Sequence, residues 1–154
     1  MQPTHAIEGA GWSVSFQRRV GAANRGALPI ATLESSPDRV RVAVPLRTGE
    51  ALWVAVIAAP SAAISVRMGT ATLDGATTSA GKDTMHRFDA EALGVADARR
   101  DVAADSLTIT LETPDGTVRI GAIAVTPQLY EELSGEPAPR PTTEDDQYGG
   151  WRLP

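Results

Sequence analysis

Apolar and polar residues alternate with a period of two wherever this sequence shows a clear periodicity. Trp12, Val14 and Phe16 are separated by polar residues, and 39–46 carries valines at every second position from 40 to 44. Successive side chains of a β-strand point to opposite faces of the sheet, so this pattern is typical of strands with one face in a core. The sequence therefore predicts an all-β fold.

The clearest predicted hairpin lies at 107–125, around a Pro-Asp-Gly turn at 114–116. Apolar residues alternate with threonines before the turn, and the alternation resumes after it. The alternation changes phase at 121–122, after which Ile123 and Val125 carry the apolar face. An extra residue beside a glycine is typical of a β-bulge, and we expect one at this point.

The stretch 52–59 is apolar on both faces of the predicted strand, because Trp53, Ala55 and Ile57 alternate with residues that are also apolar. Two interpretations are open. The strand is central in a sandwich and its outer face lies under a loop or helix, or the strand forms part of a subunit interface. An exposed apolar surface on the order of a few hundred square ångströms would call for a partner, so we favour the first interpretation.

These patterns predict an antiparallel, jelly-roll-like β-sandwich over residues 1–133. We expect 76–105 to interrupt it as a partly helical insertion, with Asp89 as a helix N-cap and Gly94 as a helix stop. A connection of this length without a strand is unusual in a compact domain and often forms an interface. One helical turn or more is expected at 127–133.

The composition changes at Ser134 to a proline-rich, acidic sequence that cannot bury enough apolar surface to offset its ordering entropy. We therefore interpret 134–154 as an extended C-terminal arm. It ends in a short stretch that contains Tyr148, Trp151 and Leu153. Buried aromatic residues often dominate the binding energy of interfaces, so these three residues and Trp53 are the predicted interface anchors.

The sequence contains no constellation that predicts catalysis. Its histidines are His5 and His86, and it has no cysteine, which excludes disulfides and thiolate metal sites. His86 lies three residues from both Asp83 and Asp89, and on a helix or loop this spacing would permit a mixed nitrogen and oxygen metal site. We favour a solvated polar loop instead, because no known ligand spacing is matched. We predict no enzymatic activity, no metal and no cofactor.

Charge and hydropathy limit the possible partners. The net charge is −5, and the bases do not gather into the basic face that binding to phosphates requires, so nucleic acid is not an expected partner. No stretch approaches the roughly 20 apolar residues of a membrane span, and the first residues lack the order of a secretory signal. The expected protein is soluble, without a membrane partner.

The segment 107–127, which ends in TVRIGAIAVTP, resembles the closing strands of jelly-roll β-sandwiches. Such sandwiches occur in carbohydrate-binding modules and in accessory proteins of tailed bacteriophage particles. The resemblance is confined to this segment and implies a fold, with no binding residue to carry over.

Our leading hypothesis is a non-catalytic structural protein of a large assembly. We expect a virion component, either a capsid-decoration (cement) or a tail protein, that has protein partners, forms a homo-oligomer and clamps neighbouring subunits with its arm. The alternative is a carbohydrate-binding module, which would be monomeric and would have a groove with an exposed tryptophan. Trp12 and Phe16 are expected to face inward, which would leave few aromatic platforms for a sugar.

Overall fold

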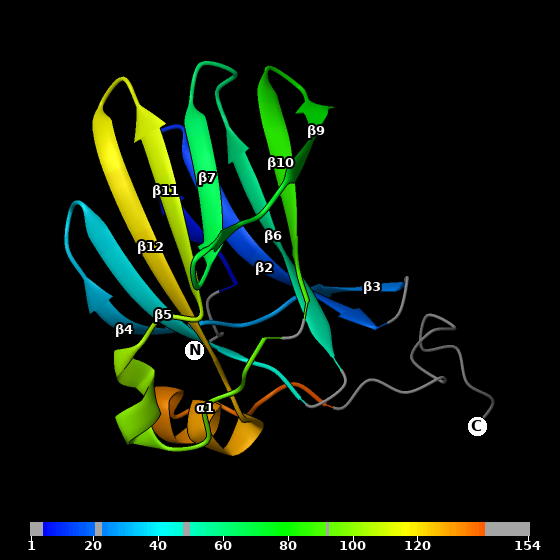
Figure 1. Cartoon of the computed structure of the whole chain (residues 1–154), viewed down its shortest axis with the longest axis vertical. Helices are drawn as coiled ribbons and strands as arrows, with labels where there is room; N and C mark the ends of the chain where they lie inside the picture. The colour runs from blue at the N-terminus through cyan, green and yellow to red at the C-terminus, as the bar shows by residue number, and fades with distance from the viewer. Residues whose placement is uncertain (1–4, 21–22, 48–49, 92, 141–154) are drawn as a thin grey trace.

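The computed structural model describes residues 5–20, 23–47, 50–91 and 93–140, which form two packed β-sheets (Figure 1). The first sheet has the order β1 (Ile7–Gly9), β2 (Trp12–Val20), β6 (Ala51–Ala58), β10 (Asp83–Ala90) and β9 (Gly75–Ala80), and β3 (Ala23–Ala27) also pairs with β2. The second sheet has the order β4 (Ala31–Ser35), β5 (Arg39–Pro45), β12 (Gly116–Val125), β11 (Leu107–Thr113), β7 (Ala63–Met68) and β8 (Ala71–Thr72). The predicted all-β sandwich is confirmed.

The core lies between the two sheets and consists of the alternating residues of the sequence. Val14 and Phe16 of β2 are fully buried, as are Val42 and Val44 of β5. Complete burial of such side chains stabilises a fold by about 1.5–3 kcal/mol each. The inward faces predicted at 12–16 and 40–46 are therefore confirmed, although Trp12 itself is only partly buried.

One strand pair departs from the predicted antiparallel arrangement. β5 and β12 run parallel, with Val40 beside Ile120 and Pro45 beside Val125, whereas every other strand pair in the described residues is antiparallel. Parallel neighbours need a long crossover. Here the chain between the two strands builds much of the first sheet before it returns. Pro45 ends β5, as its missing N–H donor suggests.

The bulge predicted at 121–122 is wrong. β12 keeps a continuous register with both β11 and β5. Its pattern changes phase because the strand is buried on both faces. Ala122 and Ala124 face the core between the sheets, whereas Ile123 and Val125 join a second apolar cluster on the outer side.

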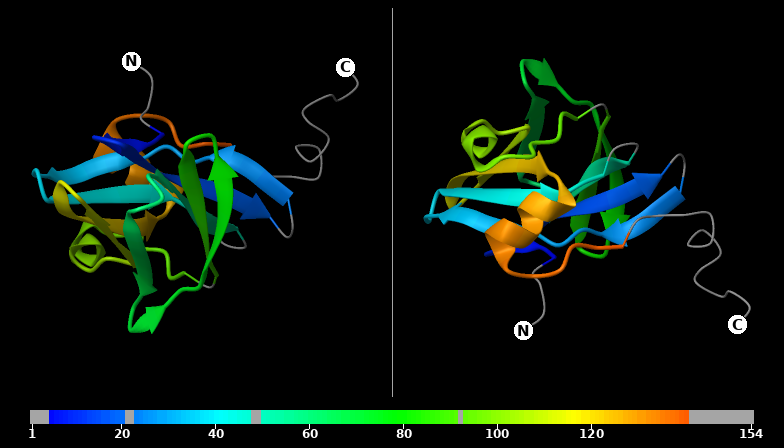
Figure 2. Two further views of the ribbon diagram at one scale, coloured as in Figure 1. Left: turned by 90° about the horizontal axis from the view of Figure 1, so that it is seen from above. Right: turned by 90° about the horizontal axis from the view of Figure 1, so that it is seen from below.

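The outer face of the second sheet is covered where β12 ends by helix α1 (Pro127–Ser134) and the 3-10 helix η1 (Arg99–Ala103), both visible at the lower end of the molecule in Figure 1. In the view from below, α1 lies in front of the strand ends (Figure 2). The N–H of Leu129 donates to the Thr126 hydroxyl at 3.3 Å, and the helix ends at Gly135 with a φ of 75°. The helix predicted at 127–133 is confirmed.

The strandless insertion predicted at 76–105 is wrong over its first half. β9 and β10 form an antiparallel hairpin there, and Asp89, the expected helix cap, lies within β10. The helical part is limited to η1. The strand pattern was hidden because both faces of the hairpin carry polar residues, which leaves no apolar alternation to detect.

The central position predicted for 52–59 is confirmed, because β6 pairs with β2 on one side and β10 on the other. On its outer face, the Arg87 side chain of the neighbouring strand β10 lies over Trp53. Trp53 is 9% exposed and Ile57 is 36% exposed on this face. The outer face of β6 is therefore buried at Trp53 and partly exposed at Ile57.

Candidate functional site

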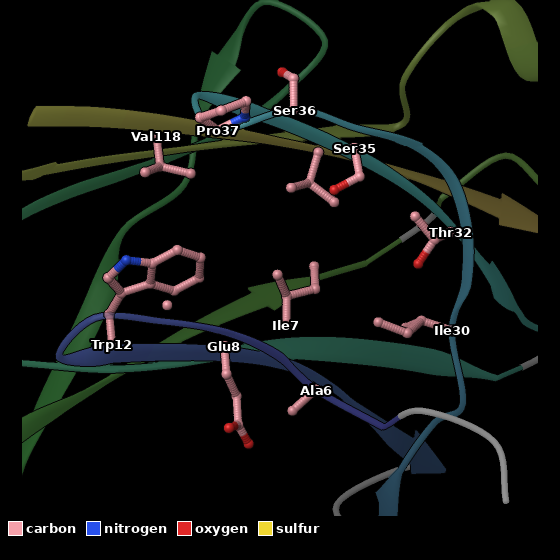
Figure 3. A pocket seen from close by; sticks show the side chains of 12 residues that line it. Ala6, Ile7, Glu8, Trp12, Ile30, Thr32, Ser35, Ser36, Pro37 and Val118 are labelled. Carbon is pink, nitrogen blue, oxygen red and sulfur yellow. The ribbon is translucent and has the colours of Figure 1, made fainter.

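A groove with a volume of about 350 Å³ opens between the two sheets, where β1 and β2 face β4 and β5 (Figure 3). Its apolar lining includes Trp12, Ile7, Ile30, Val40 and Val118, and its polar lining includes Thr32, Ser35 and Ser36. This volume lies near the lower limit of small-ligand sites, which span roughly 300–1,000 Å³. We take this groove as the candidate functional site, because aromatic, aliphatic and hydroxyl side chains line it together.

Trp12 begins β2, and its ring projects into the groove (Figure 3). Trp12 pairs with Gly9 across the β1–β2 hairpin, and a Cβ atom at Gly9 would overlap the indole. The glycine therefore allows the ring to lie against the backbone. The sequence-based placement of Trp12 in the interior is only partly right, because this edge of the sandwich leaves the indole half-buried.

A register shift in β4 brings two hydroxyl groups to the groove. Thr32 pairs with Val42 and Ser35 pairs with Val40, and the shift lies between these two pairs. Residues three apart in a regular strand face opposite sides, so the shift is what turns both side chains toward the space between the sheets. It also lets Leu33 pack in the outer cluster with α1.

The groove combines an indole, aliphatic side chains and hydroxyls. Glu8 borders it, but the carboxylate points away (Figure 3). An uncharged ligand with one apolar face and several hydroxyls, such as a sugar ring, fits this lining. The groove could not be predicted from the sequence, because neither the groove nor the β4 register shift produces a periodic pattern. The local sequence feature that belongs to the site is Gly9, which makes room for the Trp12 indole.

The strand geometry of β10 separates His86 from Asp83 and Asp89, because residues three apart in a strand point to opposite faces. No group of three or more His, Asp or Glu side chains in the described part of the chain is close enough to hold a metal ion. The metal-site alternative for these residues is wrong, and so is the solvated loop, because both assumed that 83–89 is not a strand.

His86 is half-buried and stacks on Phe88, with 6.5 Å between the ring centroids and 9° between the ring planes. Its Nε2 is buried and has no hydrogen-bond partner among the described residues. Desolvation by burial lowers the pKa of His86. Burial therefore favours the neutral form of the imidazole.

Trp53, a predicted interface anchor, lies on the outer face of the first sheet under Arg87. The guanidinium carbon of Arg87 is 4.4 Å from the centroid of the indole ring. Asp89 accepts a hydrogen bond from Arg87 at 3.2 Å and pairs with Arg19 at 3.4 Å. A partner that approaches this face meets these charges before the indole, and the role of Trp53 in an interface stays a prediction.

The first residues of the predicted arm pack against their own domain. Arg18 Nη1 donates to the carbonyl oxygen of Arg140 at 2.9 Å, and Arg47 Nη2 donates to that of Pro139 at 3.1 Å. The N–H of Ala138 donates to Glu131 Oε2 at 2.8 Å. Residues 135–140 are thus held on the sandwich. The predicted anchors Tyr148, Trp151 and Leu153 lie outside the described residues.

In the described residues no helix has the length and apolar character that crossing a bilayer requires. Comparisons of this chain with protein-family models, with curated proteins and with solved structures find no match.

Proposed function

We propose that this chain is a non-catalytic structural protein of a large assembly, a virion component of the capsid-decoration or tail type. It works as a homo-oligomer and clamps neighbouring subunits with its C-terminal arm, 134–154, whose first residues are fixed to their own domain. The observation that supports this proposal is the attachment of 135–140 to the sandwich by two arginines from different parts of the chain.

The attachment suits a clamp. The Arg18 side chain is only 15% exposed and pairs with Glu50 at 3.5 Å, so the donor to Arg140 is itself held in place. A hydrogen bond from a charged group contributes about 1.5–3 kcal/mol. A segment that leaves a rigid body from a fixed point has a high effective concentration at a neighbouring subunit, and less entropy is lost on binding.

The virion assignment draws on the resemblance of 107–127 to closing strands of jelly-roll sandwiches in phage accessory proteins. These residues contain all of β11 and all of β12, which lie in the middle of the second sheet. A two-sheet body with a continuous apolar core is a suitable rigid unit for such a particle. Localisation in a virion follows from the same proposal.

The proposal is tested by the oligomeric mass of the full chain, measured by size-exclusion chromatography with light scattering. We expect the parent protein to form oligomers and the double variant Tyr148→Ser, Trp151→Ser to run as a monomer. The matched control is Thr142→Ala with Thr143→Ala, which alters the same segment without removing an aromatic side chain. Identical masses for parent and aromatic variant would contradict the clamp.

The Trp12 groove favours a second candidate, a carbohydrate-binding module. This candidate predicts a monomer whose affinity for a glycan, identified on a glycan array and measured by calorimetry, falls about 5-fold or more in Trp12→Ala. We take the loss of a sugar stacked on the indole to be similar to that of a stacked base, about 1–3 kcal/mol. Thr32→Val tests a hydroxyl without loss of volume, and Trp53→Phe is the aromatic control. Absence of glycan binding by the parent protein would exclude this candidate.

A further inference from the structure

The edge strands of the two sheets differ in how they are protected. Sheet edges expose unpaired N–H and C=O groups, and proteins usually block them with short strands, bulges, charges or prolines. β1 has 3 residues and carries Glu8, and β8 has 2 residues. The pairings of β3 and β4 with their neighbours both contain a register shift. Each of these edges is therefore protected by a known device.

β9 has none of these devices. It is a strand of 6 residues with the sequence GATTSA, which contains no charge and no proline, and it keeps a continuous register with β10 from Gly75 to Ala80. Its residues from 75 to 79 are exposed. β9 lies at the margin of the molecule, on the side of β10 away from β6 (Figure 1). Such an edge is a template for another strand.

We infer that β9 pairs with β9 of a second copy of this chain in an antiparallel arrangement, so that the two first sheets join into one. The inference deepens the proposed function, because it names a surface through which the homo-oligomer forms. An uncharged strand is suited to pairing with itself, since no like charges meet across the twofold axis.

The charges that flank β9 select one register. Asp74 precedes the strand and Lys82, the one lysine of the sequence, follows it, and both are exposed. With the twofold axis at Thr78, paired residue numbers sum to 156, so Asp74 of each copy lies beside the Gly81–Lys82 turn of the other, within reach of the long Lys82 side chain. Within one copy the two residues are separated by the strand, which spans about 20 Å. Their charges are therefore complementary only between copies.

The backbone is consistent with this register. Gly81 and Lys82 form a two-residue turn between Ala80 and Asp83, and the pair that closes such a turn exchanges hydrogen bonds. Hydrogen-bonded and non-hydrogen-bonded pairs alternate along the β9–β10 hairpin. The N–H and C=O groups of Gly75, Thr77 and Ser79 therefore point away from β10. In the proposed register Thr77 lies opposite Ser79 of the second copy, so that outward groups meet outward groups.

The test is a charge swap in the full chain, followed by sedimentation velocity over a range of concentrations. We expect Asp74→Lys and Lys82→Asp each to raise the dimer dissociation constant about 10-fold, since two attractive contacts become repulsive. The double variant restores both pairs and returns the constant to near the parent value. Asp115→Lys, in the exposed β11–β12 turn, makes the same change of charge away from β9 and leaves association unaltered.

Two results overturn the inference: single variants that associate like the parent protein, or a double variant that stays as weak as the single ones. The arm variant with Tyr148→Ser and Trp151→Ser separates this inference from the proposed function. If it alone abolishes association, the clamp stands and β9 pairing falls. If the single charge variants weaken association, the double swap restores it and the arm variant has no effect, β9 pairing stands and the clamp falls.

Discussion

The outer faces of the two sheets are covered in different ways. On the second sheet, Ile123 and Val125 are buried beneath α1 and η1. On the first sheet, Ile57 is 36% exposed, and Trp53 is covered by the side chain of Arg87. The chain covers one face with its own backbone elements and leaves the other to long, charged side chains. In the described residues, the outer face of the first sheet is therefore less completely covered than that of the second.

The largest expected effect tests whether the helical cover is an integral part of the fold. Leu129→Ala should lower the free energy of unfolding by about 2–5 kcal/mol, because it opens a cavity under α1. Ile57→Ala, on the open face, should cost about 1 kcal/mol or less. Equilibrium urea unfolding measures both. Equal losses would contradict the distinction between the two faces.

The second effect concerns the ion pair that ties the segment after η1 to the second sheet. Asp105 accepts a hydrogen bond from Arg41 Nε at 2.9 Å, and Arg41 Nη2 donates to the Val102 carbonyl at 2.6 Å. Asp105→Ala should cost about 1–3 kcal/mol, because the half-buried guanidinium loses a charged partner.

The matched control uses the exposed pair of Arg99 with Glu132, whose side chains are 63% and 61% exposed. Glu132→Ala should cost about 0–1 kcal/mol, because solvent screens this pair. Urea unfolding of the two variants in the same buffer makes the comparison. A cost for Glu132→Ala as large as that for Asp105→Ala would show that burial does not set the difference.

A smaller effect is expected on the first sheet. Arg87→Ala removes the cation over Trp53 and should cost about 0.5–1 kcal/mol. It should also expose the indole, so that acrylamide quenches tryptophan fluorescence more strongly than in the parent protein. Unchanged quenching would mean that other side chains cover Trp53.

The smallest effect is the dependence of stability on pH. Burial lowers the pKa of His86 below its value of 6.5 in the unfolded chain. The unfolded state therefore binds the proton first, and the stability contributed by neutral His86 is present above pH 6.5 and is lost as the pH falls through this region. Between pH 8 and pH 5, the free energy of unfolding should fall less in His86→Gln than in the parent protein. An equal fall in the two proteins would contradict the burial of His86.

Strands could be predicted from the sequence where one face is apolar and the other polar, as in 12–16 and 40–46. The signal failed in β12, where Ile123 and Val125 are apolar because α1 lies on them. Gly121 is explained by packing, since a Cβ atom there would overlap the carboxylate of Asp105. These contacts join residues far apart in the sequence, and no local pattern contains them.

The candidate site was even less accessible to sequence reasoning. Thr32 and Ser35 have the spacing of opposite faces in a regular strand, and only the shifted pairing with β5 turns both inward. His86 was grouped with two aspartates on the assumption of a helix or loop, and a strand separates them. The register of β4 in the first case and the strand conformation of β10 in the second determine which side chains meet, and both depend on tertiary packing.

Hydrogen exchange of the full chain in dilute and concentrated solution tests most directly the proposal that copies of this chain associate through β9 and the C-terminal arm. We predict that higher concentration slows exchange at 75–80 and 141–154 and leaves α1 and β12 unchanged. Exchange that does not depend on concentration, or added protection at α1, would contradict it.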